Sequence, residues 1–293
     1  MGDELLTTRD AAELLGVSPS TVKRWAEQGL LPCEHTAGGH RRFRGGAVQD
    51  LLDASRRSAS APPLGGLALE DADGSGGSGG SWIARTLDLA LTSDDLTLLV
   101  HALHDRHAAL GAWWAVADDV GQVLAALGRA WASGALTVID EHLASERLRR
   151  AVLSCADTFR PAPGAPRALL ATAHGEDHDL GLVLAELALR EAGWTVRWAG
   201  RRSPVGVLLD YLDRGGLDLV VLTASSYATD ALSLADEAAT ITRAARDAQA
   251  NVLLGGSGHW PSPPPPGAVR LHSFAALHRW LAERAAPPQG LAR

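Results

Sequence analysis

The chain of 293 residues has few cysteines, which cross-link small secreted domains, and it lacks the long apolar runs that form membrane spans. Its two cysteines, Cys33 and Cys155, lie far apart, so a disulfide framework and a four-thiolate zinc site are both excluded. No run of about eighteen apolar residues occurs, and the first ten residues carry acids where a secretory signal needs a basic start. We therefore expect a soluble, cytoplasmic protein without a membrane partner.

An excess of positive charge is also missing. Lys and Arg number 27 against 34 Asp and Glu, which gives a net charge of −7 at pH 7. This balance argues against a protein that is basic over its whole surface, but it leaves room for a local basic patch that binds nucleic acid. The length allows two or three domains with hydrophobic cores of their own.

Two stretches divide the chain. Residues 61–81 end in a run of Gly and Ser, which cannot bury apolar area, so we expect a flexible linker there. Residues 160–167 contain three prolines, which stop the helix before them. The predicted domains are therefore 1–60, 82–160 and 161–293, with 61–81 as the linker.

The two larger domains differ in their patterns. Residues 82–159 lack proline, and their apolar residues recur at three- and four-residue spacing, which predicts a four-helix-type bundle. Beyond Pro166, strands are predicted at 168–172, 195–198, 217–223 and 251–254, and helices near 179–193, 204–214, 228–249 and 273–285. This alternation predicts a Rossmann-like, doubly wound parallel sheet whose ligand crevice lies beyond the carboxyl ends of the strands. The fold class is multidomain, α and α/β.

Residues 1–60 have the order of a winged helix-turn-helix. Thr7 begins a capped helix, and Ser18 and Pro19 open a second helix with an N-cap and a proline in the first position. A turn at residues 38–39 then leads into a basic strand, which we interpret as a wing. The predicted core is Ala11, Leu14, Leu15, Val17, Val22 and Trp25. The residues predicted to face DNA are Ser20, Thr21, Lys23, Arg24, His40, Arg41, Arg42 and Arg44.

The stretch Gly39-His40-Arg41-Arg42-Phe43-Arg44 resembles the wing of MerR-type DNA-binding domains, and the resemblance covers roughly residues 5–53. It implies that the wing arginines neutralise phosphates of a double-stranded DNA operator, while the second helix samples base edges or phosphates. An ordinary solvated basic face is the alternative, which the order of helix-turn-helix and basic strand disfavours. A metal site at Cys33, His35 and His40 is also disfavoured, because no second cysteine lies nearby.

A second set of residues follows the predicted strands of the sheet. Glu176-x-His178-x-x-Gly181 lies at the first strand-to-helix crevice, Thr223-Ala224-Ser225 closes the third strand, and Gly255-Gly256 follows the fourth. Taken singly, these are ordinary features, since a histidine beginning a helix is more often a capping or core residue and Gly-Gly is a turn. Their joint order favours a ligand site at the crevice.

Together these elements resemble the signature of cobalamin-binding domains, with Thr223 as a mild departure from a serine. The resemblance implies that His178 replaces the cofactor's own dimethylbenzimidazole as the lower axial cobalt ligand, and that Glu176 orients its ring. Ser225, Gly255 and Gly256 would line a slot for the displaced nucleotide tail.

In the bundle, Trp131 is followed ten residues later by Glu141-His142, with Val138 between them. A core tryptophan and a solvated Glu-His pair would be the ordinary interpretation. The spacing resembles the upper-face signature of the CarH/LitR photoreceptors, which combine a MerR-type domain, a helical bundle and a cobalamin domain. By resemblance, Trp131 and Val138 pack against the 5′-deoxyadenosyl group of adenosylcobalamin, and Glu141 and His142 contact it.

Ala132 is a departure from that family, whose members can carry a histidine there for the upper cobalt position. We therefore expect water, His142 or a more reversible ligand to hold the cobalt after illumination.

The resemblance implies a light-responsive transcriptional regulator, a repressor and not an enzyme. Light would break the cobalt–carbon bond, and a homo-oligomer, a tetramer in the dark, would change its size and release DNA. Two alternatives stay open: a light-independent regulator that senses cobalamin, and, less favoured, a corrinoid methyltransferase or isomerase subunit. His101, His104 and His107 have helical spacing, for which a solvated helix face is preferred over a metal site.

Overall fold

The computed structural model describes residues 5–15, 19–27, 31–36, 38–49, 78–226 and 231–285. The chain divides into two compact units. The first contains the N-terminal residues and the segment Ala130–Glu141, and the second contains the other helices and the parallel sheet. Among the described residues, no helix combines the length and the apolar character that crossing a bilayer requires.

The N-terminal residues form the predicted winged helix-turn-helix. Its elements are β1 (Leu5–Thr7), α1 (Thr8–Leu15), α2 (Pro19–Glu27), β2 (Cys33–His35) and β3 (Arg41–Arg44), with the strands in the antiparallel order β1-β3-β2. A reciprocal pair of contacts begins α1. Asp10 accepts hydrogen bonds from the backbone N–H and hydroxyl of Thr7, and its own N–H donates to the Thr7 hydroxyl. These bonds lower the pKa of the Asp10 carboxyl.

The core of this domain differs from prediction at one position. Ala11, Val22 and Trp25 are buried as expected, but Leu14 is 56% exposed. Helix α1 turns the face between Ala11 and Ala12 inward, and Leu14 lies about 110° from the centre of that face at 3.6 residues per turn. Leu15 is partly buried and packs against the core. Val17 lies outside the described residues.

Four helices form the bundle: α4 (Ser78–Thr92), α5 (Leu96–Leu110), α6 (Trp113–Ala132) and α7 (Val138–Ala156). Their shared core consists of buried aliphatic side chains, among them Leu99, Leu103, Val116, Val120, Val123, Leu127, Leu148 and Val152. Helix α4 begins at Ser78, so residues 78–81 are helical and not part of a linker. Glycine costs little there, because the first N–H groups of a helix have no intrahelical partner. Residues 61–77 of the predicted linker lie outside the described residues.

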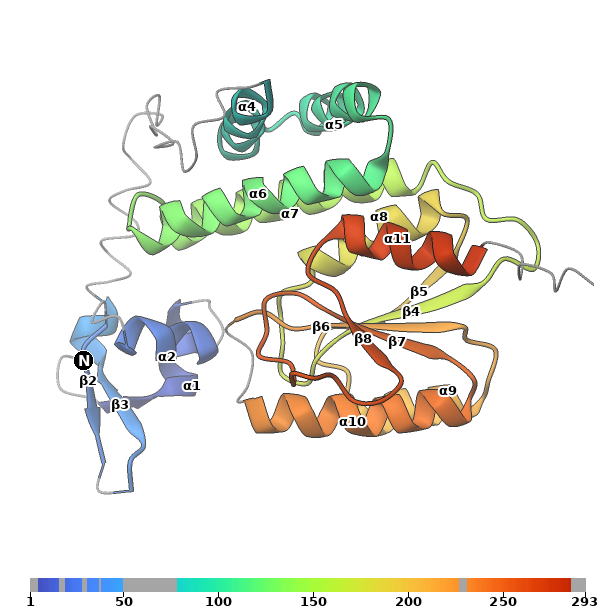
Figure 1. Ribbon diagram of the computed structural model, residues 1–293. Coiled ribbons are helices and arrows are strands. Elements are labelled where there is room, and N and C mark those ends of the chain that lie inside the picture. Colours follow the sequence, from blue (N-terminus) through green and yellow to red (C-terminus); the bar gives the residue numbers. More distant parts are fainter. Residues whose placement is uncertain are drawn as a thin grey trace, which may run out of the picture. The chain divides into compact units, whose positions relative to one another are not determined.

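The sheet follows the predicted doubly wound plan. Parallel strands β4 (Arg167–Thr172), β5 (Thr195–Gly200), β6 (Leu219–Thr223), β7 (Asn251–Gly255) and β8 (Ala268–Arg270) lie in the order β5-β4-β6-β7-β8. Helices α8 (Leu180–Glu191) and α11 (Phe274–Ala285) cover one face, while α9 (Val205–Asp213) and α10 (Ala231–Asp247) cover the other (Figure 1). Strand β8 was not predicted, because its three residues follow a proline-rich stretch and carry no alternating pattern.

Carboxylates join the bundle to the sheet domain within the second unit. Glu191, at the end of α8, accepts hydrogen bonds from the first two backbone N–H groups of α6, at 2.8 and 3.2 Å. Asp118, within α6, accepts from the first two N–H groups of α11, at 2.7 and 3.0 Å. Each carboxylate satisfies donors that a helix start leaves unpaired and complements the positive end of the helix dipole. These contacts hold α6 against α8 and α11.

The turn after β7 requires glycine for a steric reason. A Cβ at Gly256 would lie 2.2 Å from the carbonyl oxygen of Ala224 and 2.6 Å from the hydroxyl of Thr223, and the φ of Gly256 is +77°. At Gly193, by contrast, φ is +83° and no atom lies within 4 Å of an added Cβ. Substitution of Gly193 would therefore report the cost of backbone strain alone, whereas substitution of Gly256 would add a steric clash to that strain.

We predict that Gly256→Ala lowers the free energy of unfolding by about 3 kcal/mol, through overpacking added to a disfavoured φ. Gly193→Ala, which adds only the disfavoured φ, should cost about 1 kcal/mol. Urea denaturation of the full chain followed by circular dichroism measures both. Equal losses in the two variants would show that the contact with Ala224 is not tight.

Candidate functional site

The candidate site lies where the strand order of the sheet reverses. The chain runs from β4 outward to β5 and returns to β6 on the other side of β4. Thr172 at the end of β4 pairs with Thr223 at the end of β6, so the loops that follow both strands meet at one edge. Ligands of open α/β sheets bind at such switch points. The loop of residues 173–179 and the residue Ser225 meet here.

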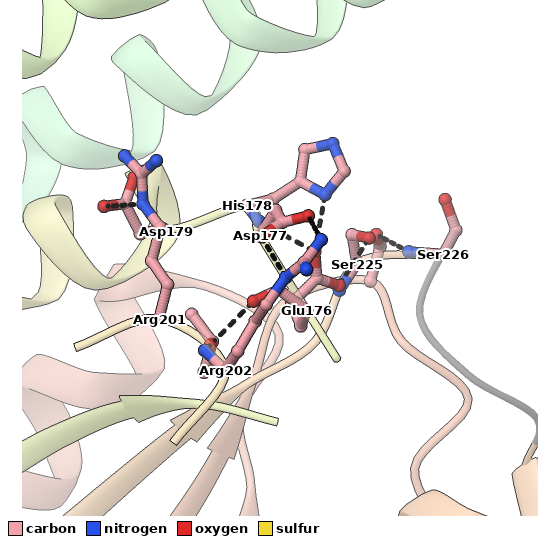
Figure 2. A network of polar contacts seen from close by, with 10 residues as sticks. Glu176, Asp177, His178, Asp179, Arg201, Arg202, Ser225 and Ser226 are labelled. Atoms are coloured by element: carbon pink, nitrogen blue, oxygen red, sulfur yellow. Dashed lines mark hydrogen bonds and ion pairs between the residues drawn. The ribbon is translucent and has the colours of Figure 1, made fainter. Parts of the chain in front are cut away.

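A buried carboxylate organises this edge (Figure 2). The side chain of Glu176 is only 2% exposed. One of its oxygens accepts from the backbone N–H of His178 at 2.8 Å and lies 2.5 Å from Nδ1 of the same residue. The other accepts from the backbone N–H and the hydroxyl of Ser225, at 2.7 and 2.6 Å. Both oxygens are therefore saturated by donors from two different loops.

These contacts keep Glu176 ionised. Burial by itself would raise the pKa of the carboxyl, yet the hydrogen bonds from His178 and Ser225 lower it to about 2. An ionised carboxylate accepts only, so Nδ1 of His178 is the nitrogen that carries the proton in this contact. The neutral ring then has its lone pair on Nε2.

The position of His178 suits a metal ligand. Its side chain is 50% exposed, although Glu176 beside it is buried. Figure 2 shows Nδ1 directed at Glu176 and the opposite edge of the ring directed away from the polar network. A carboxylate that fixes one imidazole nitrogen and turns the other outward is the usual arrangement around metal-ligating histidines.

The loop that carries His178 is held by residues from other elements. The hydroxyl of Thr172 donates to the carbonyl of Glu176 at 2.9 Å and accepts from the N–H of Arg202 at 3.0 Å. The guanidinium of Arg202 pairs with Asp177 through two of its nitrogens. These contacts fix the loop on both sides of the Glu176 carboxylate.

Asp179 and Glu237 add anchors at the two ends of the loop. Asp179 accepts from Arg201 at 2.9 Å and from Arg149 of α7 at 3.4 Å. Glu237 of α10 accepts twice from the N–H of His174, at 3.1 and 3.0 Å, and its burial raises the pKa of its carboxyl. Sequence reasoning missed these partners, because they lie 22 to 63 residues from the loop and no motif contains them.

A cavity of about 910 Å³ lies between the sheet and helices α6, α8 and α11. Gly181, Thr223, Gly255 and Gly256 line it, and most of its other lining residues are apolar. Ser225 differs from expectation, because it is not a lining residue and instead holds Glu176. The tight contact of Gly256 is with Ala224, so glycine is needed there for packing between loops.

The predicted upper-face residues have other surroundings. The segment between α6 and α7 belongs to the first unit. There Trp131 and Val138 pack against the helix-turn-helix core, and the ring centroids of Trp131 and Trp25 lie 5.8 Å apart. Glu141 is partly buried and His142 is exposed. None of these predicted residues lines the cavity, and their contact with a cofactor stays a prediction.

The wing displays most of the predicted DNA-facing residues. His40 and Arg44 are exposed, and Arg41 and Arg42 are partly buried on β3. Arg44 forms an exposed ion pair with Glu34 of β2 at 2.6 Å, so a phosphate would compete with that carboxylate. Lys23 is exposed on α2. Ser20, Thr21 and Arg24 also lie on α2, but their side chains are outside the described part of the chain.

The alternative metal sites find no geometric support in the structure. Within the described ranges, no group of three or more His, Cys, Asp or Glu residues is placed to hold a metal ion. His104 and His107 instead pack against Trp113, with centroid distances of 5.2 and 4.5 Å.

Comparisons with known proteins agree with this layout. A family of helix-turn-helix domains matches residues 5–56. The HTH-type transcriptional repressor CarA of Myxococcus xanthus is 40% identical over 73 residues, which is 25% of each chain. The HTH-type transcriptional repressor CarH of the same organism is 29% identical over 214 residues, which is 66% of this chain and 70% of CarH.

The chain therefore resembles CarH in sequence over most of its length. Its bundle and sheet also share a fold with the monomethylamine corrinoid protein of Methanosarcina barkeri, at a TM-score of 0.53 and 13% identity over 70% of this chain and 99% of the other. The chain thus joins a helix-turn-helix DNA-binding domain to the fold of a corrinoid protein.

We predict that Ser225→Ala lowers the free energy of unfolding by about 2 kcal/mol, because a buried carboxylate loses a hydroxyl donor. Ser226→Ala, at the exposed neighbouring position, should change it by less than about 0.5 kcal/mol. Chemical denaturation of the two variants beside the unsubstituted chain gives the comparison. If Ser225→Ala proved as mild as Ser226→Ala, the hydroxyl would not be a significant partner of Glu176.

Proposed function

We propose that this protein is a cytoplasmic, light-responsive transcriptional repressor that binds adenosylcobalamin. The cofactor assignment is supported by the hydrogen-bonded series Ser225–Glu176–His178, which directs one imidazole nitrogen of His178 outward. This series lies at the switch point of the sheet, and the sheet also borders a large cavity. Imidazole nitrogen is a suitable cobalt ligand, so the donor set fits a corrinoid.

Each of these three hydrogen-bonded residues has a distinct role. His178 would hold the cobalt from below through Nε2. Glu176 keeps the proton on Nδ1 and fixes the angle of the ring, and Ser225 prevents the carboxylate from turning away. Because both oxygens of Glu176 are saturated before any ligand arrives, little reorganisation is needed when the ring meets the metal.

The cavity would take the displaced nucleotide tail of the cofactor. Its volume of about 910 Å³ lies within the usual range of small-molecule sites. Gly181 and Thr223 line it: Gly181 lies in the first turn of α8, just after the loop that carries His178, and Thr223 ends β6, just before the loop that carries Ser225. These residues would hold the tail next to the loop that carries His178.

The upper face is assigned to Trp131, Val138, Glu141 and His142 by resemblance to the CarH/LitR photoreceptors. Adenosylcobalamin, when bound, supplies a cobalt–carbon bond that visible light breaks. The four residues would surround the adenosyl group and shield it from water. Trp131 also contacts Trp25 on α2, so a displacement of Trp131 would act directly on the helix-turn-helix core.

DNA binding would be controlled through assembly. Several DNA-binding domains joined in one homo-oligomer, a tetramer by resemblance, bind an operator far more tightly than one domain does, so disassembly in light would release the DNA. The residues that would contact DNA are those of α2 and the wing. Ala132 leaves the upper cobalt position without a histidine on that turn, so water or His142 would serve after illumination.

A light-independent cobalamin sensor is the second candidate. Ala132 favours it, because a position that would stabilise the illuminated state in a photoreceptor carries no ligand here. A corrinoid methyltransferase or isomerase subunit is disfavoured by the helix-turn-helix domain.

Replacing His178 tests the cofactor assignment. We predict that His178→Ala weakens adenosylcobalamin binding about tenfold or more, or shifts its absorption spectrum toward a form without a nitrogen ligand, because the lower cobalt ligand is lost. His174→Ala, on the same loop, should retain the affinity and the spectrum. Titration in the dark, followed by absorption, measures both. Unchanged binding and spectrum in His178→Ala would exclude it as the cobalt ligand.

A further inference from the structure

The charge of the cavity is unbalanced. Among the described residues that line it, Arg270 is the one lysine or arginine, and no aspartate or glutamate is present. The remaining lining residues are apolar, glycine or proline, apart from hydroxyl groups, an indole and His272. A guanidinium is always charged, so the side chains that line the cavity carry a positive charge and no carboxylate to balance it.

Arg270 is fixed in place by neutral groups only. Its Nη1 donates to the carbonyl oxygens of Leu254 and Leu271, at 2.9 and 3.1 Å, and its Nη2 donates to the carbonyl of Gly256. Within the described part of the chain, no carboxylate pairs with it. Burial accordingly lowers the pKa of Arg270. The side chain is thus rigidly held and partly desolvated, but its charge is not neutralised.

These bonds leave donors for a ligand. A guanidinium has five N–H groups, and three hydrogen bonds are accounted for, so Nε–H and one hydrogen of Nη2 have no protein partner among the described residues. Arg270 ends β8. Of the carbonyls that it binds, those of Leu254 and Gly256 lie at the carboxyl end of β7, and that of Leu271 directly follows Arg270. The donors therefore lie at the same edge of the sheet as Thr223 and Gly255.

We propose that Arg270 binds the phosphodiester of the cofactor's nucleotide tail and makes the chain select complete cobalamins over corrinoids that lack this tail. The proposal rests on the proposed function, because it assumes that the cavity receives the tail. A nucleotide tail carries a single negative charge, on its phosphodiester, and arginine is well suited to phosphate oxygens. One cation in the cavity thus matches one anion in the ligand.

The test compares two ligands that differ in the tail. Dissociation constants are measured in the dark for adenosylcobalamin and for adenosylcobinamide, which keeps the corrin ring and the adenosyl group but has no nucleotide. The proteins are the full chain, Arg270→Gln, Arg270→Lys and the exposed control Arg246→Gln. Because adenosylcobinamide retains the cobalt and can still bind His178, it also reports whether each variant keeps its fold.

For Arg270→Gln we expect adenosylcobalamin to bind roughly tenfold or more weakly, while adenosylcobinamide stays within about twofold, since only the first ligand loses a charge-assisted hydrogen bond. The affinity of Arg270→Lys for adenosylcobalamin should lie between those of the unsubstituted chain and Arg270→Gln, because lysine keeps the charge but not the planar pair of donors. Arg246→Gln should match the unsubstituted chain with both ligands.

Two results would overturn the proposal: unchanged adenosylcobalamin affinity in Arg270→Gln, or an equal loss for both ligands, which would make Arg270 a support of the turn at Gly256. Failure of the unsubstituted chain to bind either corrinoid is a different outcome. It would contradict the proposed function, and the assignment of Arg270 with it.

Discussion

The buried carboxylate of Glu176 is the interaction on which the site depends. An ionised carboxylate out of water is stable only when donors surround it, and here the donors come from the loops after β4 and β6. The order of the strands brings those loops together, so the sheet topology makes the burial possible. The same carboxylate sets which nitrogen of His178 faces outward. The burial of Glu176 therefore depends on the fold, and the proposed ligand role of His178 depends on the charge of Glu176.

Other carboxylates form hydrogen bonds that connect neighbouring elements around this site. Asp179 joins Arg149 of the bundle to the His178 loop, and Glu191 and Asp118 cap helices across the boundary between bundle and sheet. Apolar contacts accompany these bonds, since Trp114 of α6 packs against the core of the sheet domain and stacks on His278 of α11. The boundary between bundle and sheet is therefore both polar and apolar.

Periodicity and local motifs predicted most of the fold, because those signals are local. The helix-turn-helix, the bundle, four strands of the sheet and the Glu176–His178 pair could all be placed from residues close in sequence. The contacts of Ser225 and Arg149 could not, since they depend on which strands lie side by side. The role of Arg270 was also hidden, because an unpaired charge is recognised only when its surroundings are known. Leu14 was misplaced because apolar spacing alone does not fix the centre of a short helix's buried face.

The proposed control of DNA binding by cofactor photochemistry can be tested on the loaded protein. The chain is loaded with adenosylcobalamin in the dark, and absorption, mass by light scattering and binding to double-stranded operator DNA are followed before and after green light. We expect a changed cobalamin spectrum together with a smaller assembly and loss of DNA binding. A spectrum that changes while assembly and DNA binding stay constant would contradict it and favour a light-independent sensor.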